Sequence, residues 1–279
     1  MTLNSIAVDA MVRQALLEDL GPGDLTTEAT IPAEMTCTAV MIAKEAGILC
    51  GHPVARAAFR ALDASLGYEV LVAEGSEVTP GQGVARIAGS AQAILSAERV
   101  ALNFMQHMSG IATTTRRMAD SIKYYHARLT ETRQTTPGLR MIERYAVRVG
   151  GGINSRFGLH DAILVKDKHI ALVGGVREAV VAARKQKPHS SKVGVEVTTL
   201  EQLQEALEVG ADVVLLANMD PETLKRAVEL NNGKAILEAS GSIAAANLVE
   251  VAKTGVDIIS MGQLTQSVKA LDLSLEIQS

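Results

Sequence analysis

The second half of the chain alternates strand-like and helix-like segments at a nearly constant interval. Short runs rich in Val, Ile and Leu place Glu196, Ala217, Glu238 and Ser260 at equivalent strand ends, 21, 21 and 22 residues apart. Each interval accommodates one strand and one helix. Because the runs are apolar throughout, they indicate parallel strands that are buried on both faces. The spacing therefore predicts a parallel α/β domain.

Two architectures fit this alternation, an α/β barrel and a doubly wound open sheet. Polar side chains stand at the C-terminal end of nearly every predicted strand, and in a barrel those ends converge on one pocket. We therefore favour the barrel, with its active site at these ends. The polar residues concerned are Glu131, Arg133, Lys166, Asp167, Lys168, Glu196, Asn218, Glu238 and Ser240.

The first half of the chain has a different pattern of predicted helices, strands and turns. Residues 6–20 show helical spacing of apolar side chains, and residues 36–89 show short strands and turns, with a hairpin expected over 74–87. A long helical region is expected over about 91–125, with a break at Ser109 and the glycine after it. These features predict a separate N-terminal domain.

Composition excludes several classes of protein. A net charge of −4 gives no general basic field, and 3% aromatic residues without Trp argue against a nucleic-acid-binding role. No apolar run approaches membrane-spanning length, and the N-terminal residues lack an apolar signal core. Two cysteines, Cys37 and Cys50, suit a reducing compartment. We expect a cytoplasmic protein that binds neither nucleic acid nor membrane.

An arginine-rich stretch follows the first predicted barrel strand. The residues TTPG at 135–138 follow Arg133 and Gln134 closely, and Arg156 follows three consecutive glycines at 150–152. Guanidinium groups bind carboxylates and phosphates through two parallel hydrogen bonds, and glycines let backbone amides approach an anion. The stretch predicts a site for small, multiply charged anions. Arg144 and its neighbour one turn later are instead expected to form a basic helix face.

Two turns late in the chain offer backbone amides. The sequence GSIAAA at 241–246 fits either a phosphate site at a helix N-terminus or an ordinary N-cap at Ser242. A similar turn at 260–267 follows the next strand. No nucleophile–base pair and no nucleotide-binding or zinc motif is present in the sequence. The residues therefore favour a reaction that depends on positioning and charge stabilisation.

These motifs, in this order, resemble the quinolinate phosphoribosyltransferase family, also called carboxylating nicotinate-nucleotide pyrophosphorylases. The resemblance implies an N-terminal open α/β sandwich domain over 1–111, joined by a returning strand at 270–279, and an incomplete TIM-like α/β barrel over 112–269. It also implies a homodimer, or a dimer or trimer of dimers, with shared active sites. The matching stretches are EDLGPGDLTTEAT (18–30), SAERVALNFMQHMSGIAT (96–113), ETRQTTPGLRMIERYAVRVGGGINSRFGLHDAILVKDKHI (131–170), VEVTTLEQLQEALEVGADVVLLANM (195–219), LEASGSI (237–243) and GVDIISMGQLTQSVKALDLSL (255–275).

The implied activity is phosphoribosyl transfer from phosphoribosyl pyrophosphate to quinolinate, with decarboxylation. The products would be nicotinate mononucleotide, pyrophosphate and CO2, in NAD biosynthesis, with Mg²⁺ as the metal. Carried over by position, Arg133, Arg156 and, from a neighbouring subunit, Arg99 would bind the dicarboxylate. Lys166 and Glu196 would be catalytic, with Glu196 serving the ribose or the metal. The other residues implied to bind substrate are Gln134, Thr135, Ala217, Glu238, Ser240, Gly241, Ser242 and Gly262.

Four positions lose a titratable residue of the family pattern, and one position gains a lysine. A lysine of the family is replaced by Gln134, a histidine by Ser155, an aspartate by Ala217 and a second histidine by Gln266, while Lys168 stands where asparagine is usual. The loss at Ala217 removes the carboxylate that would accompany Glu196 at a metal. These changes leave an alternative open, a divergent paralogue that acts on or binds another aromatic carboxylate or a phosphorylated ligand. A catalytically inactive ligand-binding homologue is the third possibility.

Overall fold

A computed structural model describes residues 2–278, which form two compact units. Unit 1 comprises the residues up to Arg116, Thr135–Gly151 and the residues from Ser267 onward, and unit 2 comprises Arg117–Gln134 and Gly152–Gln266. The domain boundary at 111/112 stays a prediction, while the contacts of residues 135–151 group them with unit 1. Residues 1 and 279, which the predicted domains included, lie outside the described residues.

Unit 1 contains an antiparallel sheet in the order β12-β1-β5-β3. The C-terminal strand β12 pairs with β1 from Thr38↔Gln278 to Ala43↔Leu273, so the tail of the chain completes this sheet. The elements are α1 (Ser5–Leu20), α2 (Leu25–Thr30), β1 (Thr36–Ala43), β2 (Gly47–Ile48), α3 (His52–Leu62), β3 (Gly67–Val70), β4 (Glu77–Val78), β5 (Gly83–Ser90), α4 (Ala91–Ser121), α5 (Arg140–Val149) and β12 (Leu273–Gln278), with α4 ending in unit 2.

Two local predictions for this part of the chain are wrong. The expected hairpin over 74–87 does not form, because β4 pairs with β2 while β5 pairs with β1 and β3. The turn between β4 and β5 is held by Ala43 instead, which donates to Gln82 O at 2.9 Å and accepts from Gly81 N at 2.7 Å. The expected break at Ser109 is absent, since α4 is continuous. A Cβ at Gly110 would overlap the Lys269 carbonyl, so this glycine permits close backbone packing and does not end the helix.

Unit 2 contains a six-stranded parallel sheet in the order β6-β11-β10-β9-β8-β7. From β7 to β11, strands that follow each other in the chain are neighbours in the sheet. That order is the one expected of a barrel, whereas a doubly wound sheet reverses direction at a switch point. Since β6 and β7 are the two edge strands, the barrel is incomplete, as predicted.

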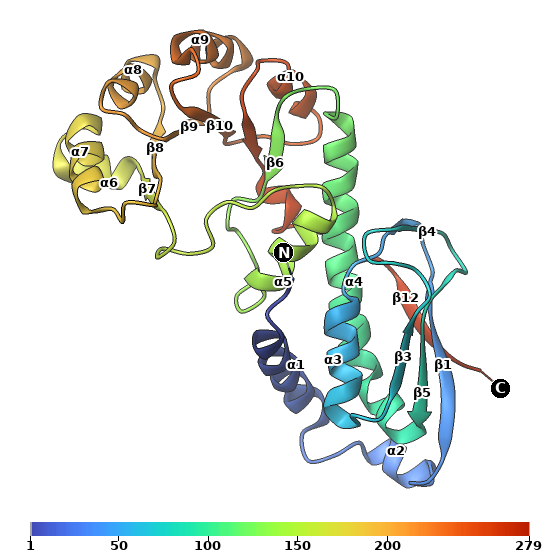
Figure 1. Ribbon diagram of the computed structural model, residues 1–279. Coiled ribbons are helices and arrows are strands. Elements are labelled where there is room, and N and C mark those ends of the chain that lie inside the picture. The colour runs from blue at the N-terminus through green and yellow to red at the C-terminus, as the bar shows by residue number, and fades with distance from the viewer. Residues whose placement is uncertain (1, 279) are drawn as a thin grey trace. The chain divides into compact units, whose positions relative to one another are not determined.

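Helices cover the outer side of this sheet (Figure 1). Helices follow β8, β9 and β10 directly, and each of them buries one face, for example through Leu203 and Ala206 of α8. The elements are β6 (Arg128–Thr130), β7 (Ile163–Val165), α6 (Asp167–Val173), α7 (Val176–Gln186), β8 (Val193–Val197), α8 (Leu200–Glu208), β9 (Val213–Ala217), α9 (Pro221–Asn231), β10 (Ile236–Ser240), α10 (Leu248–Ala252), β11 (Ile258–Ser260) and the 3₁₀ turn η1 (Gly262–Leu264).

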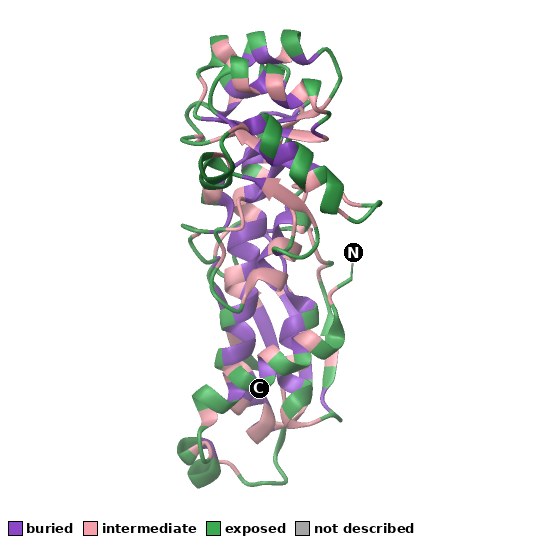
Figure 2. Cartoon of the chain, turned by 90° about the vertical axis from the view of Figure 1, so that its left-hand side faces the viewer, coloured by how far each residue is buried: buried purple, intermediate pink, exposed green. Residues whose placement is uncertain are grey.

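Buried residues lie on the strands and on the inward sides of the helices, while the outward sides are exposed (Figure 2). In β9, four of five residues are buried, which agrees with a strand covered on both faces. Within residues 2–278, no helix combines the length and the apolar character needed to cross a membrane.

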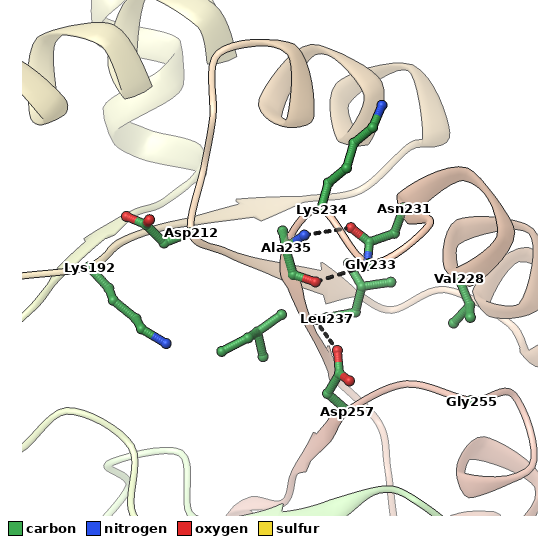
Figure 3. A pocket seen from close by; sticks show the side chains of 11 residues that line it. Lys192, Asp212, Val228, Asn231, Gly233, Lys234, Ala235, Leu237, Gly255 and Asp257 are labelled. Atoms are coloured by element: carbon green, nitrogen blue, oxygen red, sulfur yellow. Dashed lines mark hydrogen bonds between the residues drawn. The ribbon is translucent and has the colours of Figure 1, made fainter.

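The amino-terminal ends of the unit 2 strands border a polar pocket of about 450 Å³ (Figure 3). Its side chains bind the backbone. Asp212 accepts from Val193 N at 2.8 Å, and Asp257 accepts from Leu237 N at 2.8 Å. Buried Asn231 bonds to both the N–H and the C=O of Ala235. These groups fix the strand starts, as is typical of the stability face of a barrel.

Candidate active site

Charged side chains from several unit 2 strands share one environment at the C-terminal ends. Burial raises the pKa of Glu238 in β10, and the Ser260 hydroxyl opposes this shift. The charges of Glu131 and Glu196 raise the same pKa further, whereas Lys166 lowers it. The structure thus brings together residues that follow or lie in β6, β7, β8 and β10, as predicted for a barrel pocket.

Lys166 and Glu196 form an ion pair at these strand ends, with Nζ 3.3 Å from Oε2. Glu196 is the less exposed partner, at 20% of its side chain against 48% for Lys166. The backbone N–H of Lys166 donates to Nδ1 of His169 at 3.0 Å, which closes the first turn of α6. His169 is therefore a structural cap, while Lys168 on the same helix is exposed.

Arg133 and Arg156 form the second charged feature. The pKa of Arg156 is lowered first by burial and then by the positive charge of Arg133, with Asp161 acting in the opposite direction. Two guanidinium groups near enough to repel each other suit a ligand with two negative charges. Nη1 of Arg156 donates to Ala162 O at 3.1 Å, and its buried Nε has no hydrogen-bond partner among the described residues.

The loop after Arg156 is held by Asp161, a residue that the sequence analysis missed. Its carboxylate accepts from Phe157 N at 2.6 Å and from Gly158 N at 2.9 Å. These bonds lower the pKa of Asp161 against the opposing effect of burial, which is the largest single influence. The spacing Phe157 to Asp161 resembles many ordinary loops, so the sequence alone gave no signal for this role.

Glu131 follows β6 and is fully buried. Its carboxylate accepts hydrogen bonds from Arg133 N at 2.7 Å and from Ser155 N at 3.2 Å. The backbone of Arg133 adopts a left-handed conformation with φ 65°, which is unusual for a residue other than glycine. The sequence predicted Glu131 as a polar strand end, but its burial emerges only from the structure.

Two of the positions that depart from the family pattern lie together. A Cβ added at Gly262 would overlap Oε1 of Gln134 and lie 2.8 Å from Oε1 of Gln266. Gln134 also accepts from Thr132 Oγ1 at 2.7 Å, and its carbonyl accepts from Thr265 Oγ1 at 2.8 Å. We call Gln134, Gly262 and Gln266 the neutral corner.

The last residues of β9 and β10 and the residues that follow them, Ala217, Asn218, Ser240 and Gly241, are uncharged and tightly packed. Asn218 has a left-handed backbone with φ 53°, and its N–H donates to Ser240 O at 2.9 Å. Gly241 has φ 123°, and a Cβ there would overlap the Asn218 side chain. Ala217, which ends β9, is buried. Glycine is thus required at 241 for both backbone and space.

Both interpretations of residues 241–246 as a helix start are wrong. The helix α10 begins at Leu248, and Ser242 lies in the preceding turns. Asn247 closes this loop, since its side chain accepts from Ala244 N at 2.8 Å and donates to Ser242 O at 3.1 Å. The competing local hydrogen bonds of Asn explain why the helix starts late.

The remaining predicted site residues belong to unit 1. Arg99 is an exposed residue of α4, and Thr135 accepts from Arg140 Nε at 3.0 Å. Buried Glu143 accepts from Thr136 N at 3.2 Å and lies 2.9 Å from Nε2 of His107. The sequence analysis missed this support of the TTPG segment. The predicted site residues within unit 2 are Arg133, Gln134, Arg156, Lys166, Glu196, Ala217, Glu238, Ser240, Gly241, Ser242 and Gly262.

The side chains that could ligate a metal do not form a dedicated metal site among the described residues. Among residues 2–278, no three His, Cys, Asp or Glu side chains are grouped so that they could hold a metal ion. Glu196 is ion-paired with Lys166, and Ala217 supplies no ligand. Mg²⁺ commonly binds proteins through one or two carboxylates together with substrate phosphates, so a single carboxylate can contribute only when a phosphorylated ligand brings the ion.

Known proteins have a similar sequence and fold. Residues 24–109 and 111–276 match the family models for the N-terminal and C-terminal domains of quinolinate phosphoribosyl transferase. A probable nicotinate-nucleotide pyrophosphorylase [carboxylating] of Bacillus subtilis is 41% identical over 275 residues, covering 99% of this chain and 95% of that protein. The chloroplastic nicotinate-nucleotide pyrophosphorylase [carboxylating] of Arabidopsis thaliana is 43% identical, covering 97% of this chain and 82% of that protein.

A solved structure of the nicotinate-nucleotide pyrophosphorylase from Francisella tularensis superposes with a TM-score of 0.95 at 40% identity, covering 99% of this chain and 98% of that chain. The coverage of both domains leaves neither half of the chain unaccounted for. The chain therefore belongs to the quinolinate phosphoribosyl transferase family.

Proposed function

We propose that the protein transfers a phosphoribosyl group from phosphoribosyl pyrophosphate to quinolinate and releases CO2, which yields nicotinate mononucleotide for NAD biosynthesis. The observation that supports this most directly is that one domain of a family barrel carries both the Arg133–Arg156 pair and the Lys166–Glu196 ion pair. The relatives named above are described as carboxylating nicotinate-nucleotide pyrophosphorylases.

The arginine pair suits the acid. A pyridine dicarboxylate presents two carboxylates on adjacent ring atoms, and two mutually repelling guanidinium groups bind such a dianion in preference to a monoanion. The buried Nε of Arg156 offers a hydrogen bond that a ligand oxygen can accept. Binding of a dianion would relieve the repulsion from Arg133, which adds to the larger effect of burial in lowering the pKa of Arg156.

The chemistry needs no protein nucleophile. The pyridine nitrogen attacks C1 of the ribose, the C1–O bond breaks, and pyrophosphate leaves with the bonding electrons. The ring nitrogen is then positively charged, so the C2–carboxylate bond can break toward it. CO2 departs, and a proton replaces it at C2. Lys166 would stabilise the anionic substrates, and Glu196 would bind the ribose hydroxyls, because both groups lie at the strand ends.

Mg²⁺, when bound, neutralises charge on the departing pyrophosphate. In this chain Glu196 would be its protein ligand, and the phosphates of the donor would complete the coordination. We further propose a cytoplasmic homodimer in which the exposed Arg99 enters the site of the neighbouring subunit. Several plant relatives are named as mitochondrial or chloroplastic.

The test is an assay for nicotinate mononucleotide and pyrophosphate from quinolinate and phosphoribosyl pyrophosphate with Mg²⁺. Product formation at a kcat of about 0.1–10 s⁻¹ would support the proposal, since typical enzymes have kcat values near or above this range. Saturable quinolinate binding without turnover would replace it with a ligand-binding role. Turnover of another aromatic acid in preference to quinolinate would identify a divergent paralogue.

A further inference from the structure

Glu131 is a buried carboxylate that the proposed reaction does not use. It is fully buried after β6, and moving a carboxylate from water into a protein interior is costly unless hydrogen bonds compensate. A buried charge at the edge of a binding site therefore requires a structural or functional reason.

The hydrogen bonds of Glu131 divide between its two oxygens. Oε1 accepts from the backbone N–H of Ser155 at 3.2 Å and from its hydroxyl at 3.0 Å. Oε2 accepts from the backbone N–H of Arg133 at 2.7 Å and again lies 3.0 Å from the Ser155 hydroxyl. Each oxygen thus binds one backbone N–H, and only a carboxylate can accept at both places.

These two backbone groups belong to the segments that carry the arginine pair. One is the N–H of Arg133 itself, in its left-handed conformation, and the other is the N–H of the residue before Arg156. The segments also touch through the bridge between Thr130 and Ile153. Carboxylate and bridge together join two stretches that lie more than twenty residues apart in the sequence.

We propose that Glu131, with Ser155 as its partner, is a positioning residue that sets the separation and orientation of Arg133 and Arg156. The inference rests on the proposed function only in naming a pyridine dicarboxylate as the ligand of the arginines. A residue other than glycine keeps a left-handed backbone when surrounding contacts hold it there. At Arg133, the hydrogen bond from its N–H to Glu131 is such a contact.

The experiment compares Glu131→Gln with Ser155→Ala. The amide of Gln has nearly the shape of the carboxylate, but it turns an NH₂ group toward one of the two backbone N–H donors. We expect the Kd for quinolinate, measured by equilibrium dialysis without donor, to rise about 30- to 100-fold in Glu131→Gln, and about 3- to 10-fold in Ser155→Ala, which keeps both backbone bonds. KM for phosphoribosyl pyrophosphate should change by less than about threefold, because the proposed function assigns Arg133 and Arg156 to the acid and not to the donor.

A matched control separates positioning from general destabilisation. Asn231 is also buried in unit 2 and binds the Ala235 backbone at the opposite ends of the strands. Asn231→Asp is the same kind of isosteric exchange, and it should lower the melting temperature without altering the Kd for quinolinate. If Glu131→Gln also lowers only the melting temperature, the positioning role is overturned.

Crystal structures of the variants provide a readout that is independent of activity. We expect Arg133 to leave the left-handed region in Glu131→Gln and Arg156 to shift relative to it, with a smaller shift in Ser155→Ala. Unchanged arginines would overturn the proposal even if turnover were lost. If wild-type protein binds no quinolinate, the proposed function fails, whereas the structural outcome still tests the positioning of the arginines.

Discussion

The residues at the strand ends of unit 2 form two sets, which we call the charged half and the neutral half. The charged half contains the Arg133–Arg156 pair, the Lys166–Glu196 ion pair, Glu238 and the buried Glu131, which binds the N–H of Arg133. The neutral half contains the amides of the neutral corner and the close contact between Gly241 and Asn218. The first half is organised by charge and hydrogen bonds, and the second by steric fit.

This difference separates two tasks. Charge compensation in the first half suits recognition of an aromatic acid, which the arginines would bind whatever the donor. In the neutral half, glycines and amide side chains are in close contact. An added charge or a larger side chain there would act directly on the second substrate, phosphoribosyl pyrophosphate. Removing a side chain from the charged half should therefore have a large effect on activity. In the neutral half, adding a charge or a larger side chain should have the larger effect.

Arg156→Ala tests the removal of a guanidinium group from the charged half. It deletes charge-assisted hydrogen bonds of roughly 1.5–3 kcal/mol each, so kcat/KM for quinolinate should fall at least about 100-fold. Steady-state kinetics checks this result. Arg177→Ala is the matched control, because Arg177 forms an exposed ion pair with Glu208 on the outer helices. A loss below about threefold for Arg156→Ala would contradict the assignment of this half to the acid.

Gly241→Val tests added volume in the neutral half. The new side chain overlaps Asn218 and strains a backbone with φ 123°, so we expect a stability loss of about 1–3 kcal/mol and a fall in turnover. Thermal denaturation measures the stability loss, and steady-state kinetics with varied donor concentration measure kcat and the donor KM. Gly233→Ala is the control, since Gly233 has φ 75° with nothing within 4 Å of its added Cβ. Equal effects on donor KM in both variants would show that contact with Asn218 is irrelevant.

Ala217→Asp tests added charge at the end of β9. A second carboxylate would supplement Glu196, so the Mg²⁺ concentration for half-maximal activity should fall about tenfold, equivalent to about 1.4 kcal/mol. A titration of activity against Mg²⁺ measures it, with Ala217→Asn as the isosteric uncharged control. An unchanged midpoint would place the metal away from β9.

Gln134→Lys adds a cation to the neutral corner. The donor is polyanionic, so its KM should fall by about two- to fivefold at low salt, and the gain should shrink at high salt because the residue is exposed. Kinetics at two ionic strengths, with Gln134→Met as an uncharged control, tests this expectation. A salt-independent change would mean that the new charge does not face the phosphates.

Glu238→Gln tests titration in the charged half and should have the smallest effect on stability. Because the pKa of Glu238 is raised above its ordinary value of 4.5, the folded protein retains a proton that the unfolded chain loses as pH rises. The free energy of unfolding therefore falls with rising pH through the window above pH 4.5, and Gln should flatten that slope. Denaturant unfolding from pH 4.5 to 7 measures the slope; an unaltered slope would exclude Glu238 as its source.

Much of the fold was predictable because it follows local periodicity. The regular spacing from Glu196 to Ser260 corresponds to β8 through β11, and the polar strand ends gather as a barrel requires. Predictions based on single residues were less successful. Gly110 interrupts no helix, since its lack of a side chain serves a contact with the distant Lys269. Ser242 caps no helix, because Asn247 closes the preceding loop.

The sequence by itself determined the α/β alternation, the family motifs and the identity of the arginines, because these depend on residue type and spacing along the chain. Only the tertiary structure decided which groups meet. It joined Glu131 to Ser155, set Gln134 and Gln266 against Gly262, and buried Glu143 beneath Thr136. The physical reason is that burial and hydrogen-bond partners are set by contacts between segments far apart in sequence, and no local pattern encodes them.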